Sequence, residues 1–148
     1  MRYNQLMFYR IIRRKVIRRR TRRKPRRAPN RADYLARKDM AYTLALERLT
    51  HYRNEYAKID AIYAEAFKYN RVTIRNTSTR WGSCSSKKNL NFNYRILDLP
   101  PELRDYVIVH ELCHLKELHH GKTFWDLMEI MIPRAQEFHL RARKMKLG

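Results

Sequence analysis

Residues 101–120 read PELRDYVIVHELCHLKELHH, and this stretch decides the fold. Pro101 suits the first turn of a helix, and Glu102 and Asp105 follow near its start, where the helix dipole favours acidic side chains. Apolar residues then surround much of the segment instead of lining one face, which is typical of a buried helix. The pattern therefore predicts a buried helix from Glu102 to about Leu118.

The predicted helix contains the pattern H-E-x-x-H, from His110 to His114. Two histidines four residues apart share one helix face, and their ring nitrogens can converge on one Zn²⁺ at about 2.0–2.1 Å. Glu111 would project beside the ion, where it could take a proton from zinc-bound water. Burying these polar groups in an apolar helix is costly unless they bind something. The pattern therefore favours a catalytic zinc site over two hydrogen-bonded core histidines.

A catalytic zinc site needs a third protein ligand and one open position. His120 follows His114 by six residues, and Gly121 eases a turn that could bring His120 back toward the ion. His119 is the neighbouring competitor, and Glu129 is a candidate from the following segment. We favour His120, because it completes a three-ligand site without a further element.

The rest of the chain predicts an α+β fold. Apolar and aromatic residues at intervals of three and four, from Tyr42 to Tyr63, predict one long helix over about 32–66, with its tyrosines in the core, and allow a break near His51. Residues 71–75 and 89–93 alternate polar and apolar side chains, which predicts a small antiparallel sheet of two or three strands. Thr123 could cap another helix, and Pro133 could open a final helix that ends near Lys146.

The net charge of +20 is concentrated at the start of the chain. Residues 1–31 hold 14 Lys and Arg and no acid, and the densest run is RRKVIRRRTRRKPRR, residues 13–27. We interpret residues 1–30 as a basic arm, which like-charge repulsion is expected to keep flexible, and residues 31–148 as one domain. Such clusters bind polyanions by counterion release, so DNA or RNA is the expected partner and an anionic membrane surface the alternative. The candidate contacts are Arg13, Arg14, Lys15, Arg18, Arg19, Arg20, Arg22, Arg23 and Lys24.

The amino-acid composition excludes several other classes of protein. The sequence has no run of about 20 apolar residues that would predict a transmembrane helix. Two cysteines cannot form a multi-disulfide scaffold, and Cys84 and Cys113 lack the spacing of a second metal site. A cytosolic setting with reduced thiols is the simplest interpretation.

Four segments together resemble the YgjP-like (DUF45) metallopeptidase family and, more widely, the SprT and WLM domains: TRWGSCS at 79–85, NLNFN at 89–93, DYVIVHELCHL at 105–115, and His120 with Phe124 and Trp125. The similarity covers about residues 71–133. It implies a zincin-type α+β domain in which His110, His114 and His120 hold zinc and Glu111 is the general base.

The segment around Trp81 has two interpretations. Zincins bind an extended peptide at a sheet edge by strand addition, and residues 79–84 could be that edge. The alternative is structural, with Trp81 packing the core and Gly82 permitting a tight backbone. The candidate substrate-binding residues are Arg80, Trp81, Gly82, Ser83 and Asn93. The candidate donors to an oxyanion are Tyr94, Arg95 and His139.

The sequence thus predicts a zinc-dependent metallopeptidase, with a basic arm that could recruit it to nucleic acid. Two alternatives remain at this stage. One is a metal-dependent nucleotide hydrolase that uses the same residues. The other is a nucleic-acid-binding module with a structural zinc, which is weakened because structural zinc sites have four protein ligands and only three are found here.

Overall fold

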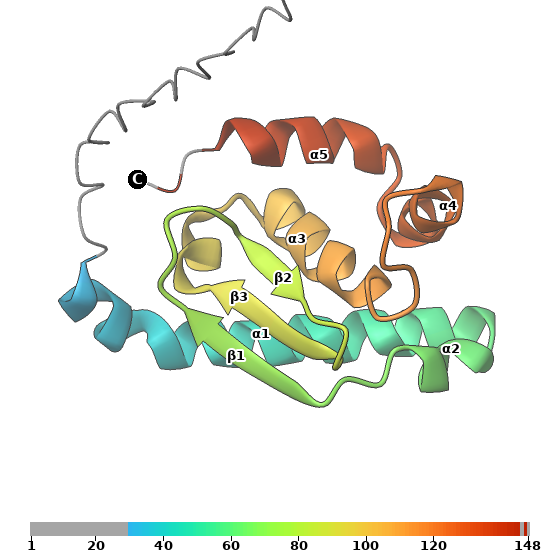
Figure 1. Ribbon diagram of the computed structural model, residues 1–148, viewed down its shortest axis with the longest axis horizontal. Coiled ribbons are helices and arrows are strands. Elements are labelled where there is room, and N and C mark those ends of the chain that lie inside the picture. The colour runs from blue at the N-terminus through green and yellow to red at the C-terminus, as the bar shows by residue number, and fades with distance from the viewer. Residues whose placement is uncertain (1–29, 146, 148) are drawn as a thin grey trace, which may run out of the picture.

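The computed structural model describes residues 30–145 and 147, and it shows an α+β fold (Figure 1). The helix α1 spans the length of the molecule on one side, and α5 lies across α3 on the opposite side (Figure 1). The elements in chain order are α1 (Arg31–Ile59), α2 (Ile62–Ala66), β1 (Arg71–Arg75), β2 (Gly82–Cys84), β3 (Asn89–Asn93), the 3₁₀ helix η1 (Tyr94–Asp98), α3 (Pro101–Cys113), α4 (Lys122–Met131) and α5 (Ala135–Lys144).

The first helix is continuous through His51, so the allowed break near that residue is absent. The chain leaves the helix at Asp60, whose backbone is extended and whose carboxylate accepts a hydrogen bond from the Ile62 backbone N–H. The buried face of α1 consists of Ala41, Ala45, Leu49, Tyr52 and Tyr56. The predicted stripe was therefore partly misplaced.

At the ends of that stripe, Tyr42 and Ile59 are 41% and 58% exposed, respectively. The small side chains of Ala41 and Ala45 face the core instead. A pattern of large apolar residues misses such positions, because alanine carries little weight in it.

The three-stranded sheet is mixed, in the order β1-β3-β2. The strands β2 and β3 form an antiparallel hairpin, whereas β1 and β3 are parallel, with Val72 beside Leu90 and Ile74 beside Phe92. The predicted all-antiparallel sheet was wrong in this respect, because β3 lies between two strands that precede it in sequence. This order leaves β2 as the edge strand next to α3.

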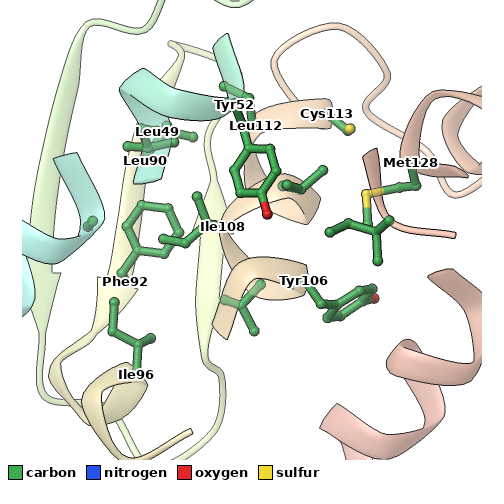
Figure 2. Close-up of a cluster of buried hydrophobic side chains, with 14 of the residues drawn as sticks. Leu49, Tyr52, Leu90, Phe92, Ile96, Tyr106, Ile108, Leu112, Cys113 and Met128 are labelled. Atoms are coloured by element: carbon green, nitrogen blue, oxygen red, sulfur yellow. The ribbon is translucent and has the colours of Figure 1, made fainter. Parts of the chain in front are cut away.

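The helix α3 lies at the centre of the core, as its composition predicted. Figure 2 shows it between Leu49 and Tyr52 of α1, Phe92 of β3 and Met128 of α4. The helix ends at Cys113, five residues earlier than expected. His114 takes the C-cap position, and the following turn is closed by backbone N–H groups of 115–117 that donate to Leu112 and Cys113.

Two polar contacts connect α1 to the helices α3 and α4. The Arg48 guanidinium donates two hydrogen bonds to the Asp105 carboxylate of α3, both at 2.7 Å. The fully buried hydroxyl of Tyr56 donates to the Leu127 carbonyl of α4 at 2.8 Å. These contacts fix α3 and α4 against a common support.

The last two helices begin differently from the prediction. Gly121 is the N-cap of α4, while the Thr123 hydroxyl donates to Glu117 Oε2 instead of capping the helix. Pro133 precedes α5, but Arg134 takes a left-handed backbone with φ of 61° and the helix begins at Ala135. The carboxylate of Glu129 accepts hydrogen bonds from the backbone N–H groups of Arg134 and Ala135, at 2.7 and 2.8 Å.

Among the described residues, no helix is long and apolar enough to cross a bilayer. The predicted nucleic-acid contacts, residues 13–24, lie outside the described residues.

Candidate metal centre

Three imidazole nitrogens converge at the C-terminal end of α3. The Nε2 atoms of His110 and His114 are 3.2 Å apart, and the Nε2 of His120 lies 3.1 Å from the first and 2.9 Å from the second. Within the described part of the chain, these three residues form the group of metal-ligating side chains that could hold an ion.

The turn after α3 brings His120 back to the helix. The Nδ1 of His114 lies 2.9 Å from the Glu117 carbonyl oxygen, and the Thr123 hydroxyl donates to the Glu117 carboxylate. The buried ring of Phe124 then packs against all three imidazoles, with centroid distances of 5.0, 4.7 and 4.7 Å to His110, His114 and His120. An apolar base and an anchored turn therefore hold the third histidine in place.

The donor set fits a zinc ion. Nitrogens bound to one tetrahedral zinc at about 2.0–2.1 Å lie about 3.3 Å from one another, close to the separations here. Burial lowers the pKa of His110 to about 3, with a smaller contribution from the neighbouring histidines, and burial also lowers the pKa of His114. Neutral imidazoles with three adjacent lone pairs repel one another, and a shared cation removes that repulsion.

The Glu111 side chain packs against the edge strand at Gly82, where any larger residue would overlap it. A Cβ atom built on Gly82 would stand 2.6 Å from Glu111 Cγ and 2.7 Å from its Oε1. Glu111 is only 6% exposed, and burial raises the pKa of its carboxyl to about 8, opposed by the charge of Arg80. The edge strand and the helix thus close tightly on this carboxylate, in agreement with the close backbone approach that glycine in a strand indicates.

Tyr106 connects His110 to a fourth histidine. Its hydroxyl lies 2.9 Å from His110 Nδ1 and 2.9 Å from His139 Nδ1 of α5. The rings of His110 and His139 are nearly parallel, with an interplanar angle of 13° and centroids 6.1 Å apart. Burial lowers the pKa of His139. The hydroxyl therefore couples the orientation of a metal-facing imidazole to that of a second imidazole above it.

Two cavities flank this centre and share the side chains of His110 and Glu111. The larger, about 420 Å³, lies toward the 78–82 loop and α5. The smaller, about 240 Å³, lies toward Cys84, His114 and Leu118. Gly82 of the edge strand lines both. The two cavities therefore lie on either side of Glu111 and His110, as a site that acts on an extended chain requires.

Residues 8–144 match the family described as YgjP-like, metallopeptidase domain. The chain belongs to the YgjP-like family. The match includes the H-E-x-x-H helix and extends into the basic segment that was separated from the domain on charge alone. Membership in a metallopeptidase family makes the protein a metal-dependent peptidase and favours this activity over a nucleotide hydrolase or a binding module.

A solved structure supports the same assignment. The chain is similar to the metallopeptidase zymogen of Pyrococcus abyssi abylysin, with 27% sequence identity and a TM-score of 0.50, over 66% of this chain and 90% of that chain. A comparison with curated proteins found no match.

The structure brings together most of the residues that the sequence singled out in this YgjP-like domain. His110, Glu111, His114 and His120 share one centre, and Arg80, Trp81 and Gly82 line the larger cavity beside it. His119 is exposed and outside the group of converging nitrogens. Glu129, the other candidate ligand, instead accepts the backbone hydrogen bonds at the start of α5.

Other candidates have structural contacts. Asn93 is buried, and its amide donates to the Thr77 and Arg80 carbonyls, so it holds the loop that carries Arg80. Ser83 lies on β2, where its hydroxyl accepts a hydrogen bond from Asn91. Tyr94 is fully buried and donates to Asp33, and its hydroxyl also receives the Nε–H of Arg95. Of the three candidate oxyanion donors, His139 is therefore the one beside the metal centre.

The sequence analysis assigned no functional role to Tyr106, which is one of the residues of the predicted buried helix. A signal was present, because Tyr106 stands four residues before His110 and so shares its helix face. Arg143, which lines the larger cavity from α5, carries no motif and could be found only from the fold.

Proposed function

We propose that this protein is a zinc-dependent peptidase in which His110, His114 and His120 hold the metal and Glu111 is the general base. The convergence of three Nε2 atoms beside a buried glutamate is the observation that carries the proposal. Three protein ligands with cavities beside them suit a catalytic site, whereas a structural zinc would use four protein ligands.

A bound zinc ion would act as a Lewis acid that lowers the pKa of water and polarises the substrate carbonyl. The chain itself moves the proton. The Glu111 carboxylate takes a proton from the attacking water and passes it to the leaving amine, which balances the hydrolysis of one peptide bond. Its carboxylate is held against the edge strand at Gly82, so it is fixed close to a chain bound along that strand.

His139 is the proposed donor to the oxyanion, and the hydrogen-bond order around Tyr106 supports it. With Nε2 facing the metal position, His110 carries its proton on Nδ1 and donates it to the Tyr106 oxygen. The single hydroxyl proton of Tyr106 is then donated to His139 Nδ1. A neutral His139 consequently carries its own proton on Nε2, where it can be donated to a negative oxygen in the cavity that it lines.

The edge strand supplies the proposed platform for substrate. Within the described part of the chain, β2 pairs only with β3, and its second edge would accept an extended peptide. Backbone hydrogen bonds from β2 would align the peptide beside Glu111. Side-chain selection would then fall to the two cavities on either side of Glu111.

Recruitment to nucleic acid by residues 1–30 stays part of the proposal, and its support is compositional. The 14 Lys and Arg of residues 1–31 would release many counterions on binding DNA or RNA. We also retain the cytosolic setting as a prediction, supported by two cysteines that are both free thiols.

The test combines zinc content with hydrolysis of an unfolded protein such as casein. Glu111→Gln should retain zinc and lose activity, because the amide cannot accept the proton. His139→Phe should also retain zinc, with kcat reduced about 10²- to 10³-fold. Full activity of zinc-loaded Glu111→Gln would refute the assigned base.

A further inference from the structure

The larger cavity has a distinct charge. It lies directly beside His110 and Glu111 and is bounded by the 78–82 loop on one side and by α5 with its extension on the other. Two arginines line it, Arg80 from the loop and Arg143 from α5. Its remaining wall mixes polar and apolar residues, with Val107, Ala142 and Met145 among the apolar ones.

Among the described residues, neither arginine forms a salt bridge, and Arg80 acts on Glu111 only through its charge, which opposes the rise of the Glu111 pKa. Comparable arginines are paired. Arg141, which lies on α5 like Arg143, pairs with Glu102 at 3.1 Å. Arg48 of α1 pairs with Asp105 at 2.7 Å. Among the described residues, the only acidic side chain that lines the cavity is Glu111, which the mechanism already uses. Two arginines thus line one space next to the reacting centre, and Glu111 is the single carboxylate that the described residues place there with them.

We propose that this cavity is a specificity subsite that binds a carboxylate of the substrate next to the bond that is cleaved. The inference rests on the proposed peptidase function and adds the substrate class, a peptide with an acidic residue at one position beside the cleaved bond. A guanidinium presents parallel N–H donors that match a carboxylate, so two of them in one pocket favour an acidic group over a neutral one of the same shape.

The walls of the cavity support an acidic side chain as its occupant. Ser78 and Thr79 also line the cavity, and their hydroxyl groups can donate further hydrogen bonds to carboxylate oxygens. The apolar residues of the wall suit the methylene groups of such a side chain. The smaller cavity, on the other side of Gly82, has no arginine or lysine among the described residues that line it, so the preference should apply to one side of the cleaved bond.

The experiment uses paired peptides that differ only by Glu or Gln at each position around the cleaved bond. The zinc-loaded wild type should cleave one Glu peptide with kcat/KM about tenfold to a hundredfold above its Gln partner, the range of one charge-assisted hydrogen bond. Arg143→Glu should abolish or invert this ratio. The matched control is Lys144→Glu, which makes the same charge change on the neighbouring exposed residue and should preserve the ratio.

A carboxylate could also come from the end of the peptide chain, and a second pair of substrates separates the two sources. If amidation of the peptide C-terminus removes the preference while Glu and Gln behave alike, the subsite binds a terminal carboxylate. Equal kcat/KM for all paired substrates would overturn the proposal, as would an Arg143→Glu variant that discriminates like the wild type.

Failure of the subsite and failure of the peptidase proposal give different results. A wild type that cleaves acidic and neutral peptides equally well loses only the subsite. A wild type that cleaves none loses the peptidase function.

The subsite then remains testable by fluorescence anisotropy of the same labelled peptides on the Glu111→Gln protein. Stronger binding of the Glu peptide, lost in Arg143→Glu, would support it, and equal binding would overturn it. The melting temperature of each variant checks that it is folded.

Discussion

Gly82→Ala tests whether the fit between the edge strand and Glu111 matters for catalysis. The substitution adds one methyl group to β2. That carbon would stand 2.6 Å from Glu111 Cγ, 2.7 Å from Oε1 and 2.9 Å from Cδ. Ordinary contacts between such atoms are about 3.5–4.0 Å, so the Glu111 side chain must withdraw by about 1 Å.

A displacement of this size has a predictable effect on rate. Misplacing a reacting group by about 1 Å costs about 10²-fold, or about 2.7 kcal/mol of transition-state stabilisation. The three atoms nearest to the added carbon all belong to Glu111, so the displacement should fall on that side chain and zinc should remain bound. The expected result is a kcat about 10²-fold lower at normal zinc content.

The assay compares kcat and zinc content with those of Gly121→Ala, a matched control. A Cβ atom at Gly121 meets nothing within 4 Å, and its φ of −78° is open to any residue. In the Glu111→Gln background, Gly82→Ala should add little further loss, because both changes act on one group. A wild-type kcat for Gly82→Ala would refute the reasoning. So would a fall in kcat that is as large in the Glu111→Gln background as in the wild type.

Three further predictions concern the support of the site. Tyr106→Phe removes the hydroxyl beside His110 Nδ1, so zinc affinity measured against a chelator should fall about 10- to 100-fold. Arg48→Met leaves the partly buried Asp105 without its two hydrogen bonds, and urea denaturation should show a loss of about 1–3 kcal/mol. Glu129→Ala removes the cap of α5, so unfolding free energy should fall by about 1 kcal/mol while zinc stoichiometry stays unchanged.

Each of these has a control or a contrary result. Unchanged zinc affinity in Tyr106→Phe would contradict its positioning role. For Arg48→Met the control is Lys122→Met, which breaks the exposed pair with Asp126 and should cost less than about 1 kcal/mol. Loss of zinc from folded Glu129→Ala would restore Glu129 as a ligand.

Local patterns in the sequence were enough to predict several of the strands and helices of this protein. The strands over residues 71–75 and 89–93 were confirmed with the same bounds, because alternation of side chains is a property of the segment itself. The central buried helix was confirmed for a similar reason, since apolar residues around most of its surface favour burial on several sides.

Tertiary contacts decided what the sequence left open or placed wrongly. The parallel pairing of β1 with β3 depends on the order of the strands in the sheet, and the local sequence pattern of a strand does not determine that order. The early end of α3 is fixed by a turn anchored at Glu117. The contact between Tyr106 and His139 spans 33 residues and exists only because α5 packs across α3.

Zinc content, measured by elemental analysis, tests the central claim most directly. The account predicts one zinc per wild-type chain, loss of that zinc in His120→Ala, and retention in His119→Ala, the same change at the adjacent exposed histidine. Absence of zinc from the wild type after zinc is offered, or equal zinc binding by His120→Ala, would contradict the three-histidine centre.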